Sequence, residues 1–280
     1  MASLSRTGVP WVVNPPDNEG PGFSWNPITG CLKRCEWCYA HALAKGRLRE
    51  PYLANDQCLP GPKAWLDAQP MYSNAVPPAA YDDAFWPRWW QDRLFAPIHR
   101  QKPSGIFVVN MGDLFGPWVP RRMIDGVLDV IQGCPQHRFY FLTKFPERLR
   151  EFNPWPANAW VGATATDFES FVGATLHLGA VEVQMRYISL EPLLDWPGLP
   201  VVDTLRALCI NTYKQLLDVN DISWLIVGPC NGPLAKQYPC DPRWLEGIGA
   251  ACDAAGVAVF EKPECARLGL GRPLRREFPL

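Results

Sequence analysis

Long apolar runs are absent from this sequence. No stretch reaches the roughly 18 apolar residues that a membrane-spanning helix needs, so we expect no membrane association. Residues 1–8 also lack the apolar segment of a secretory signal, and the expected location is therefore cytoplasmic. Internal repeats and low-complexity tracts are missing as well.

An excess of charge of either sign is also absent. The 27 Lys and Arg residues nearly balance the 28 Asp and Glu residues, which leaves a net charge of −1. This balance excludes a global positive field that would draw the protein to nucleic acid, although a local basic patch is compatible with it.

The 10 cysteines do not indicate a disulfide-stapled secreted protein. A chain of 280 residues is far larger than the miniproteins that depend on such staples. The tightest group of cysteines, within residues 31–38, has the spacing of metal ligands rather than of staples. We therefore expect reduced cysteines in a reducing compartment.

Six short apolar runs recur along the chain, with helical patterns between some of them. Continuous apolar runs of this length are typical of strands buried on both faces, and hence of a parallel sheet. Together with a strand before Cys31, the alternation predicts an α/β fold, namely a partial or full (β/α) TIM-like barrel of parallel strands. A flat, doubly wound sheet remains the alternative, because both architectures bury parallel strands. The expected strands are 106–110, 139–143, 160–164, 186–190, 224–228 and 257–261, and the expected helices are 121–132, 167–178 and 242–255.

Two long segments interrupt this alternation, at about 46–104 and 200–221. Loops of this length inside a compact enzyme are usually lids or binding elements. We predict a single barrel domain over residues 1–280 with both segments as insertions, and a helix across 82–98 in the first. The first segment is rich in tryptophans, which can stack on bases or simply pack the segment onto the barrel: Trp65, Trp86, Trp89 and Trp90.

Cys31, Cys35 and Cys38 stand in the run Trp25 to Tyr39 with the spacing C-x3-C-x2-C. Three thiolates on one loop hold three irons of a 4Fe–4S cube, whereas a closed cluster usually takes four. The open fourth iron, beside S-adenosylmethionine (SAM), is the starting point of radical chemistry. Three alternatives stay open.

The first alternative is a zinc site completed by His41. The second is a redox pair of Cys35 and Cys38, which leaves Cys31 unexplained. The third is chance spacing in a chain with many cysteines.

Polar residues follow every predicted strand. In a barrel, function collects at the carboxyl ends of the strands, so these residues are candidates for an active-site rim. The alternative is that strand ends are polar because they meet water. The residues are Asn110, Gly112, Asp113, Thr143, Lys144, Thr164, Thr166, Ser189, Glu191, Gly228, Asn231, Glu261 and Lys262.

The cysteine motif, with an aromatic residue before its last cysteine, resembles the signature of the radical SAM superfamily. The opening Trp25-Asn26-Pro27-x-Thr29-Gly30-Cys31 goes further and resembles a family of phage and bacterial radical SAM proteins. Other runs are similar to the same family: Asn110 to Phe115, Leu142 to Arg148, Ser189 to Leu194, and Trp224 to Gly228.

This resemblance implies a radical SAM enzyme with two cofactors, a 4Fe–4S cluster at the three cysteines and SAM. SAM chelates the open iron, and one electron cleaves a carbon–sulfur bond to give methionine and a 5′-deoxyadenosyl radical that abstracts hydrogen from a substrate. An electron donor such as flavodoxin or ferredoxin is implied as a partner.

The strand-end residues are then expected to bind SAM. Asp113, with backbone carbonyls near Asn110 to Gly112, accepts from the SAM ammonium, and Trp37 shields the cluster and packs near the nucleoside. Six further residues are expected to bind the SAM carboxylate, the ribose hydroxyls or an anionic substrate. They are Lys144, Thr164, Thr166, Ser189, Glu191 and Lys262.

The substrate class is open. A nucleic acid or nucleotide is the preferred substrate, and a small metabolite or peptide is the alternative. A non-enzymatic zinc-binding module is the competing class of function.

Overall fold

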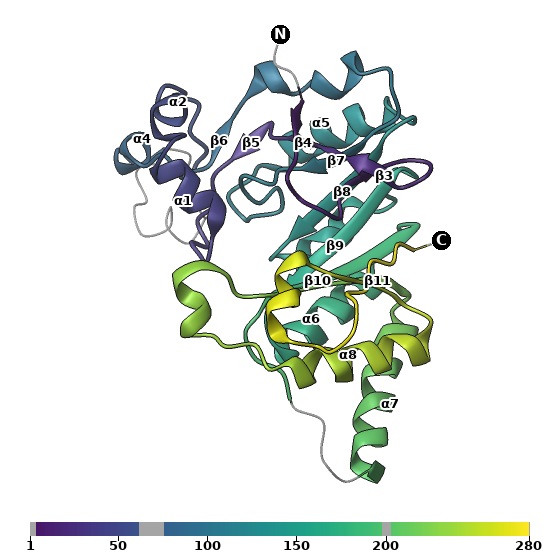
Figure 1. Ribbon diagram of the computed structural model, residues 1–280. Helices are drawn as coiled ribbons and strands as arrows, with labels where there is room; N and C mark the ends of the chain where they lie inside the picture. Colours follow the sequence, from purple (N-terminus) through teal and green to yellow (C-terminus); the bar gives the residue numbers. More distant parts are fainter. Residues whose placement is uncertain (1–3, 62–75, 198–202, 280) are drawn as a thin grey trace. The chain divides into compact units, whose positions relative to one another are not determined.

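The computed structural model describes residues 4–61, 76–197 and 203–279 (Figure 1). By its internal contacts the chain divides into two compact units, the first formed by Met1–Phe145 with Pro156–Ala159 and the second by Pro146–Trp155 with Trp160–Leu280. Two parts of the expected insertions, residues 62–75 with Trp65 and residues 200–202, lie outside the described residues. The single-domain organisation stays a prediction.

The first unit contains the strand order β1-β4-β7-β8. β1 runs antiparallel to β4, whereas β4, β7 and β8 are parallel neighbours. Every residue of β7 is buried, which explains its continuous apolar run, because a parallel strand covered on both faces has no side that favours polar residues. The bounds are β1 Ser5–Arg6, β4 Phe23–Trp25, β7 Gly105–Val108 and β8 Arg138–Thr143. Two small antiparallel ribbons complete the strands, β2 Val13–Asn14 with β3 Glu19–Pro21, and β5 Ile28–Thr29 with β6 Arg88–Trp89.

The helices of the first unit include the expected one. α5 spans Arg121–Gln132 between Pro120 and Gly133 and buries an apolar face that contains Ile124 and Val127. The other helices are α1 Tyr39–Lys45, α2 Arg49–Leu53, α4 Ala79–Asp82 and the 3₁₀ turns η1 Gln91–Arg93 and η2 Ala96–His99.

The expected helix across 82–98 is wrong. α4 ends at Asp82, and β6, η1 and η2 follow in its place. Pro87 lacks the backbone donor that a helix interior requires. The next amide groups bond to other segments: Trp89 N donates to Gln57 O at 2.9 Å, and Trp90 N donates to Pro27 O at 2.8 Å.

The second unit contains four parallel strands in the order β9-β10-β11-β12. Their bounds are β9 Ala159–Ala165, β10 Met185–Leu193, β11 Ile222–Pro229 and β12 Ala258–Glu261. The helices are α6 Phe168–Gly179, α7 Asp203–Val219 and α8 Pro242–Ala255, with the 3₁₀ turns η3 Pro146–Phe152, η4 Gly232–Lys236 and η5 Pro263–Leu268.

Most of the second expected insertion, 200–221, is the helix α7. It connects the parallel strands β10 and β11 and contacts α6 and α8 (Figure 1). Parallel neighbours need a crossover connection, usually a helix. This segment is therefore the connection of a βαβ unit.

The predicted α/β fold of parallel strands is confirmed, and each expected apolar run forms a strand. Parallel neighbours follow one another in the sequence within each unit, as in a partial (β/α) barrel, whereas the strand order of a doubly wound sheet reverses. Within the described ranges, no helix has the length and apolarity that crossing a membrane requires.

Candidate functional site

The three cysteines lie on one loop that leads into α1. All three are free thiols and half-buried. Cys38 is the N-cap of α1, where its Sγ accepts from His41 N at 3.4 Å, and its own N donates to Cys35 O at 3.1 Å. Arg34 turns the loop with a φ of 49°. The loop therefore presents its thiols from a folded turn rather than from an extended chain.

Gly30 determines how the chain enters this loop. Its φ is +87°, and a Cβ here would lie 2.4 Å from Trp86 O and 2.6 Å from Phe85 O. Gly30 N donates to Met111 O at 2.8 Å, and a Cβ on Gly112 would lie 2.6 Å from Gly30 O. Only glycine permits such close backbone approaches. The pair Gly30 and Gly112 thereby ties the cysteine loop to residues 110–113, which follow β7.

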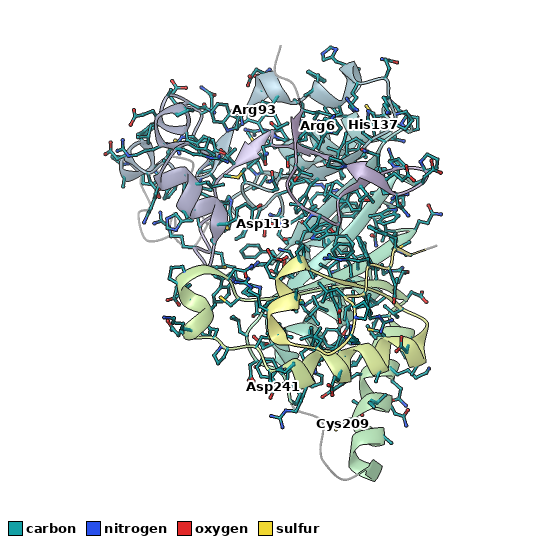
Figure 2. All side chains as sticks on the ribbon, in the orientation of Figure 1. Arg6, Arg93, Asp113, His137, Cys209 and Asp241 are labelled. Carbon is teal, nitrogen blue, oxygen red and sulfur yellow. The ribbon has the colours of Figure 1, made fainter. Side chains whose placement is uncertain are left out.

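Asp113 lies buried beside the loop (Figure 2). Its Oδ1 accepts from the Thr143 hydroxyl at 2.7 Å and from Phe115 N at 3.1 Å, and its Oδ2 accepts from Lys144 N at 3.0 Å. Burial raises the pKa of Asp113, and these hydrogen bonds oppose that rise. A carboxylate offers about four acceptor positions, and the protein fills three of them. Asp113 thus holds the end of β8 next to the cysteines.

The charge environment of the thiols is set by burial and by two neighbours. Burial raises the pKa of Cys31 to about 12, and the carboxylate of Asp113 adds to the rise. Burial also raises the pKa of Cys38, whereas hydrogen bonds from backbone amides and the charge of Lys144 lower it. A thiol in this setting keeps its proton until a metal takes the place of that proton.

A single metal ion and an iron–sulfur cube make different demands on the ligands of this loop. Within the described ranges, no group of three or more His, Cys, Asp or Glu side chains is placed to hold one metal ion. An iron–sulfur cube instead distributes its thiolates over separate irons. His41, the expected fourth zinc ligand, packs its ring against Phe85 at 5.0 Å, and burial lowers its pKa. Its Nε2 is buried without a partner among the described residues, which keeps zinc as an outcome to be tested.

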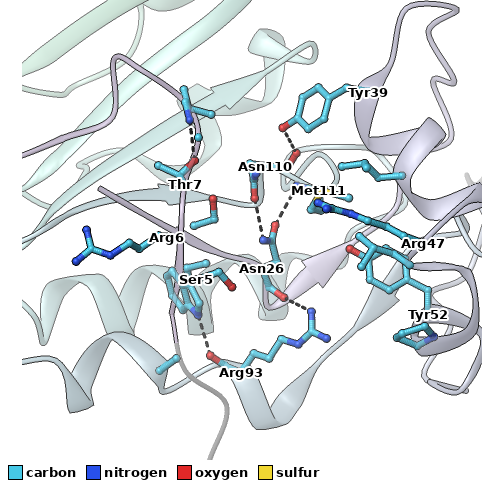
Figure 3. Close-up of a pocket in the computed structure, with 18 residues that line it drawn as sticks. Ser5, Arg6, Thr7, Asn26, Tyr39, Arg47, Tyr52, Arg93, Asn110 and Met111 are labelled. Carbon is cyan, nitrogen blue, oxygen red and sulfur yellow. Dashed lines mark hydrogen bonds between the residues drawn. The ribbon is translucent and has the colours of Figure 1, made fainter. Parts of the chain in front are cut away.

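Asn26 and Tyr39 also belong to this site, and the sequence motifs contain them without indicating their role. Asn26 Nδ2 donates to Asn110 Oδ1 at 2.8 Å, and Asn26 Oδ1 accepts from Met111 N at 2.9 Å. The Tyr39 hydroxyl donates to Asn110 O at 2.7 Å (Figure 3). Just before this turn, Val109 has a φ of 57°, a strained conformation for a β-branched residue. The turn is therefore held in place by its neighbours.

Two cationic side chains of the loop contact neighbouring segments. Lys33 Nζ donates to Lys144 O at 3.3 Å and lies 5.1 Å from the centre of the Phe145 ring. Arg34 forms an ion pair with Asp83. The cysteine loop is thus attached to the end of β8 and to the segment that precedes β6.

The second unit gathers the other predicted residues at the carboxyl ends of its strands. Thr164 of β9 and Ser189 of β10 are partners in the parallel register. The Ser189 hydroxyl is fully buried with no partner among the described residues, which is a costly arrangement. Glu191 and Lys262 form an ion pair. These residues form a polar group at the strand ends of the second unit.

Thr166 has a structural role. Its hydroxyl donates to Asp167 Oδ2 at 3.0 Å, and Asp167 is the N-cap of α6, with a capping box completed by Ser170. Burial acts to raise the pKa of Asp167, but hydrogen bonds from Ser170 and Thr166 outweigh it and lower the pKa. The cap therefore stabilises α6 in its charged form.

We expect Asp167→Ala to lower the free energy of unfolding by about 1 kcal/mol at neutral pH, because the first turn of α6 loses its acceptor. The folded pKa is depressed, so this contribution is present above the unfolded pKa and is lost as the pH falls through the folded value. Urea unfolding at neutral and acid pH measures both effects. Asp167→Asn, which keeps an acceptor but not the charge, is the control, and an alanine effect that does not change with pH would contradict the prediction.

The described tryptophans of the first insertion, Trp86, Trp89 and Trp90, are buried or half-buried. Trp86 is 5% exposed and its Nε1 donates to Leu59 O at 2.8 Å, whereas Trp90 Nε1 donates to Thr29 Oγ1 at 2.8 Å. Trp89 pairs in β6 and is half-buried. These contacts favour the packing interpretation over base stacking.

Each unit contains part of the set of predicted residues. Asn110, Gly112, Asp113 and Lys144 lie around the cysteine loop, on which Trp37 is half-buried. Thr164, Thr166, Ser189, Glu191 and Lys262 lie at the strand ends of the second unit. Their roles toward a cofactor stay predictions.

Fold and site together define an α/β protein with parallel strands and a three-cysteine loop after an early strand. The chain belongs to the family described as "Protein of unknown function (DUF5131)", which matches residues 20–265. No curated protein matches it.

Two solved structures are similar to the chain. One is "Spore photoproduct lyase complexed with dinucleoside spore photoproduct", which is 11% identical in sequence with a TM-score of 0.48. The match covers 92% of this chain and 81% of that protein's chain. The other is a mutant of spore photoproduct lyase, which is 9% identical with a TM-score of 0.45. That match covers 91% of this chain and 80% of the mutant's chain.

Proposed function

We propose that the chain is a radical SAM enzyme whose cluster is held by Cys31, Cys35 and Cys38. The observation that carries the proposal is the loop itself, with three free thiols at C-x3-C-x2-C spacing on one folded turn. When bound, the cluster supplies one electron that cleaves SAM into methionine and a 5′-deoxyadenosyl radical, which abstracts hydrogen from the substrate.

The residues around the loop have separate tasks in this proposal. Asp113 positions the backbone of Lys144, and the charge of Lys144 acts on Cys38. The Lys144 ammonium is then suited to the carboxylate of SAM. Carbonyl groups of residues 110–112 accept from the SAM ammonium, with Asp113 as a further acceptor. Trp37 covers the cluster and limits the access of water.

The polar residues of the second unit are proposed to bind SAM or the substrate through their hydroxyl, carboxylate and ammonium groups. The hydroxyls of Thr164 and Ser189 donate to a carboxylate or accept from ribose hydroxyls. The Thr166 hydroxyl does the same once it releases its hydrogen bond to Asp167, the N-cap of α6. Glu191 accepts from ribose hydroxyls, and Lys262, its partner in the ion pair, neutralises an anionic group. In this proposal a flavodoxin or ferredoxin in the cytoplasm supplies the electron. The chain is also proposed to be related to the phage and bacterial radical SAM family.

Anaerobic reconstitution with iron and sulfide tests this proposal. We expect an absorption band near about 400 nm, typical of thiolate-bound clusters. After reduction with dithionite in the presence of SAM, 5′-deoxyadenosine and methionine are expected in equal amounts. Stoichiometric zinc without such a band would favour the zinc module and remove the radical interpretation. A cluster that forms without any cleavage of SAM would also contradict the proposed activity.

A further inference from the structure

A pocket of about 670 Å³ lies in the first unit, beside the turn that holds the cysteine loop (Figure 3). Asn110 and Met111 belong both to its wall and to that turn, and Tyr39, which also lines the pocket, donates to Asn110 O. This volume is within the roughly 300–1,000 Å³ of ordinary ligand sites. The pocket is therefore large enough for a ligand and is coupled to the cysteine loop by shared residues.

The charge of the wall is of one sign. Arg6, Arg47 and Arg93 contribute to it, and no Asp or Glu is among the residues that line it. The whole chain has a net charge of −1, so this concentration of positive charge is local. A wall of this kind attracts an anion.

Two of the arginines extend into the pocket from different segments of the chain. In Figure 3, Arg47 and Arg93 both extend toward the middle of the lining residues, whereas Arg6 extends away from them. The Arg93 guanidinium lies 3.5 Å from the centre of the Trp90 ring, and its Nη1 donates to Asn26 O at 3.5 Å. Burial lowers the pKa of Arg93, and Tyr52 and Asp92 oppose that shift. Its charge is thus held in place before any ligand arrives, while Arg47 is exposed and adaptable.

An exposed aromatic ring completes the wall. Tyr39 is 53% exposed, although its hydroxyl is fixed on Asn110 O at 2.7 Å. An exposed ring that is held by its hydroxyl offers a base a stacking surface at little entropic cost. A cation pair beside such a ring matches a phosphate joined to a nucleoside.

We propose that this pocket binds a phosphate-bearing nucleotide unit, with Arg47 and Arg93 on the phosphate and the Tyr39 ring on the base. The planar guanidinium fork is suited to two phosphate oxygens at once. The unit belongs either to a free nucleotide or to a nucleic-acid strand, which share this chemistry. Its use as the substrate of the neighbouring cysteine site rests on the proposed function, whereas the binding itself does not.

Fluorescence anisotropy on the full reconstituted protein tests the site, with a labelled oligo-dT strand as the probe. Arg47→Gln is expected to weaken binding about five- to tenfold at about 50 mM salt and to reduce the salt slope by about 0.7. The matched control is Arg49→Gln, since Arg49 is exposed, two residues away and outside the wall; we expect less than about twofold change. Tyr39→Leu is a second variant, expected to weaken binding about fivefold by removing the stacking surface.

Competition with dAMP separates the two sources of the nucleotide. Displacement of the strand by dAMP at similar concentrations of nucleotide units supports a free nucleotide, and a strong preference for the strand supports nucleic acid. No binding of either probe, or equal losses in the Arg47 and Arg49 variants, would overturn the proposal.

The result is independent of the radical chemistry. Cys35→Ala is expected to keep the binding of the strand, and Arg47→Gln is expected to keep the absorption of the cluster. A protein that binds the strand but forms no cluster would leave this site standing and remove the proposed function.

Discussion

Cys35→Ala is expected to abolish both the absorption of the cluster and the formation of 5′-deoxyadenosine. A three-cysteine loop has no ligand to spare, because each thiolate holds one iron and the fourth iron stays open. The three thiols share one loop whose ends are fixed by Gly30 and by the N-cap of α1. Iron and sulfide content, absorption and product analysis measure the loss.

Cys209→Ser is the matched control for this variant. Cys209 lies on α7 and outside the loop (Figure 2), so the cluster and the product are expected to persist at the level of the unchanged protein. Circular dichroism separates loss of the cluster from loss of the fold. Cleavage of SAM by folded Cys35→Ala protein would show that the cysteine loop is not the cluster site.

The parts of the structure that sequence patterns predicted correctly are local in the chain. Strands such as β7 and β11 are continuous apolar runs, because both of their faces are covered. The C-x3-C-x2-C motif of the cysteine loop lies within eight consecutive residues, 31–38. α5 and α8 show helical periodicity and end just before glycines 133 and 256. Each of these features follows from a rule that acts over a few residues.

The parts that sequence patterns missed depend on contacts between distant segments. Asn26 meets Asn110 across 84 residues, and Tyr39 meets the same residue across 71. The periodicity of apolar residues does not predict contacts between residues so far apart in the sequence. The helix expected across 82–98 failed for the same reason, since the amides of Trp89 and Trp90 bond to distant carbonyls. Tertiary hydrogen bonds outweighed local helix propensity there.

The first insertion has a structural role in the site rather than that of a lid alone. Phe85 O accepts from Cys31 N at 3.1 Å, and Asp83 forms an ion pair with Arg34 of the loop. The carbonyls of Phe85 and Trp86 also form the wall that only a glycine at position 30 tolerates. The turn 83–86 is thus a support on which the cysteine loop rests, and its own stability becomes part of the metal site.

Arg88 holds this turn together. It is fully buried, and among the described residues its guanidinium donates to four backbone carbonyls. Nη1 bonds to Asp83 O at 2.7 Å and to Trp86 O at 3.0 Å, Nη2 bonds to Ala80 O at 3.0 Å, and Nε bonds to Asn55 O at 2.8 Å. Five N–H groups in a rigid fork allow one side chain to serve acceptors in several directions. Lysine, with three donors on one atom, cannot span them.

Arg88→Leu is accordingly expected to lower the free energy of unfolding by about 3–5 kcal/mol, since buried carbonyl groups lose their donor. Chemical denaturation of the apoprotein measures this loss. Arg88→Lys keeps the charge but reaches fewer carbonyls, so an intermediate loss is expected. Arg49→Leu, at an exposed arginine, is the control and should change stability by less than about 0.5 kcal/mol.

A second measurement connects Arg88 to the cysteine loop. If the turn 83–86 supports the loop, iron occupancy after reconstitution falls in Arg88→Lys even at temperatures where that variant is folded. Loss of stability with full iron occupancy would mean that Arg88 stabilises the insertion alone. Full stability in Arg88→Leu would mean that the four carbonyls find other donors, and the hydrogen bonds of Arg88 would then contribute little to the fold. The cluster therefore reports whether a buried cation 50 residues beyond Cys38 helps to shape the loop that binds it.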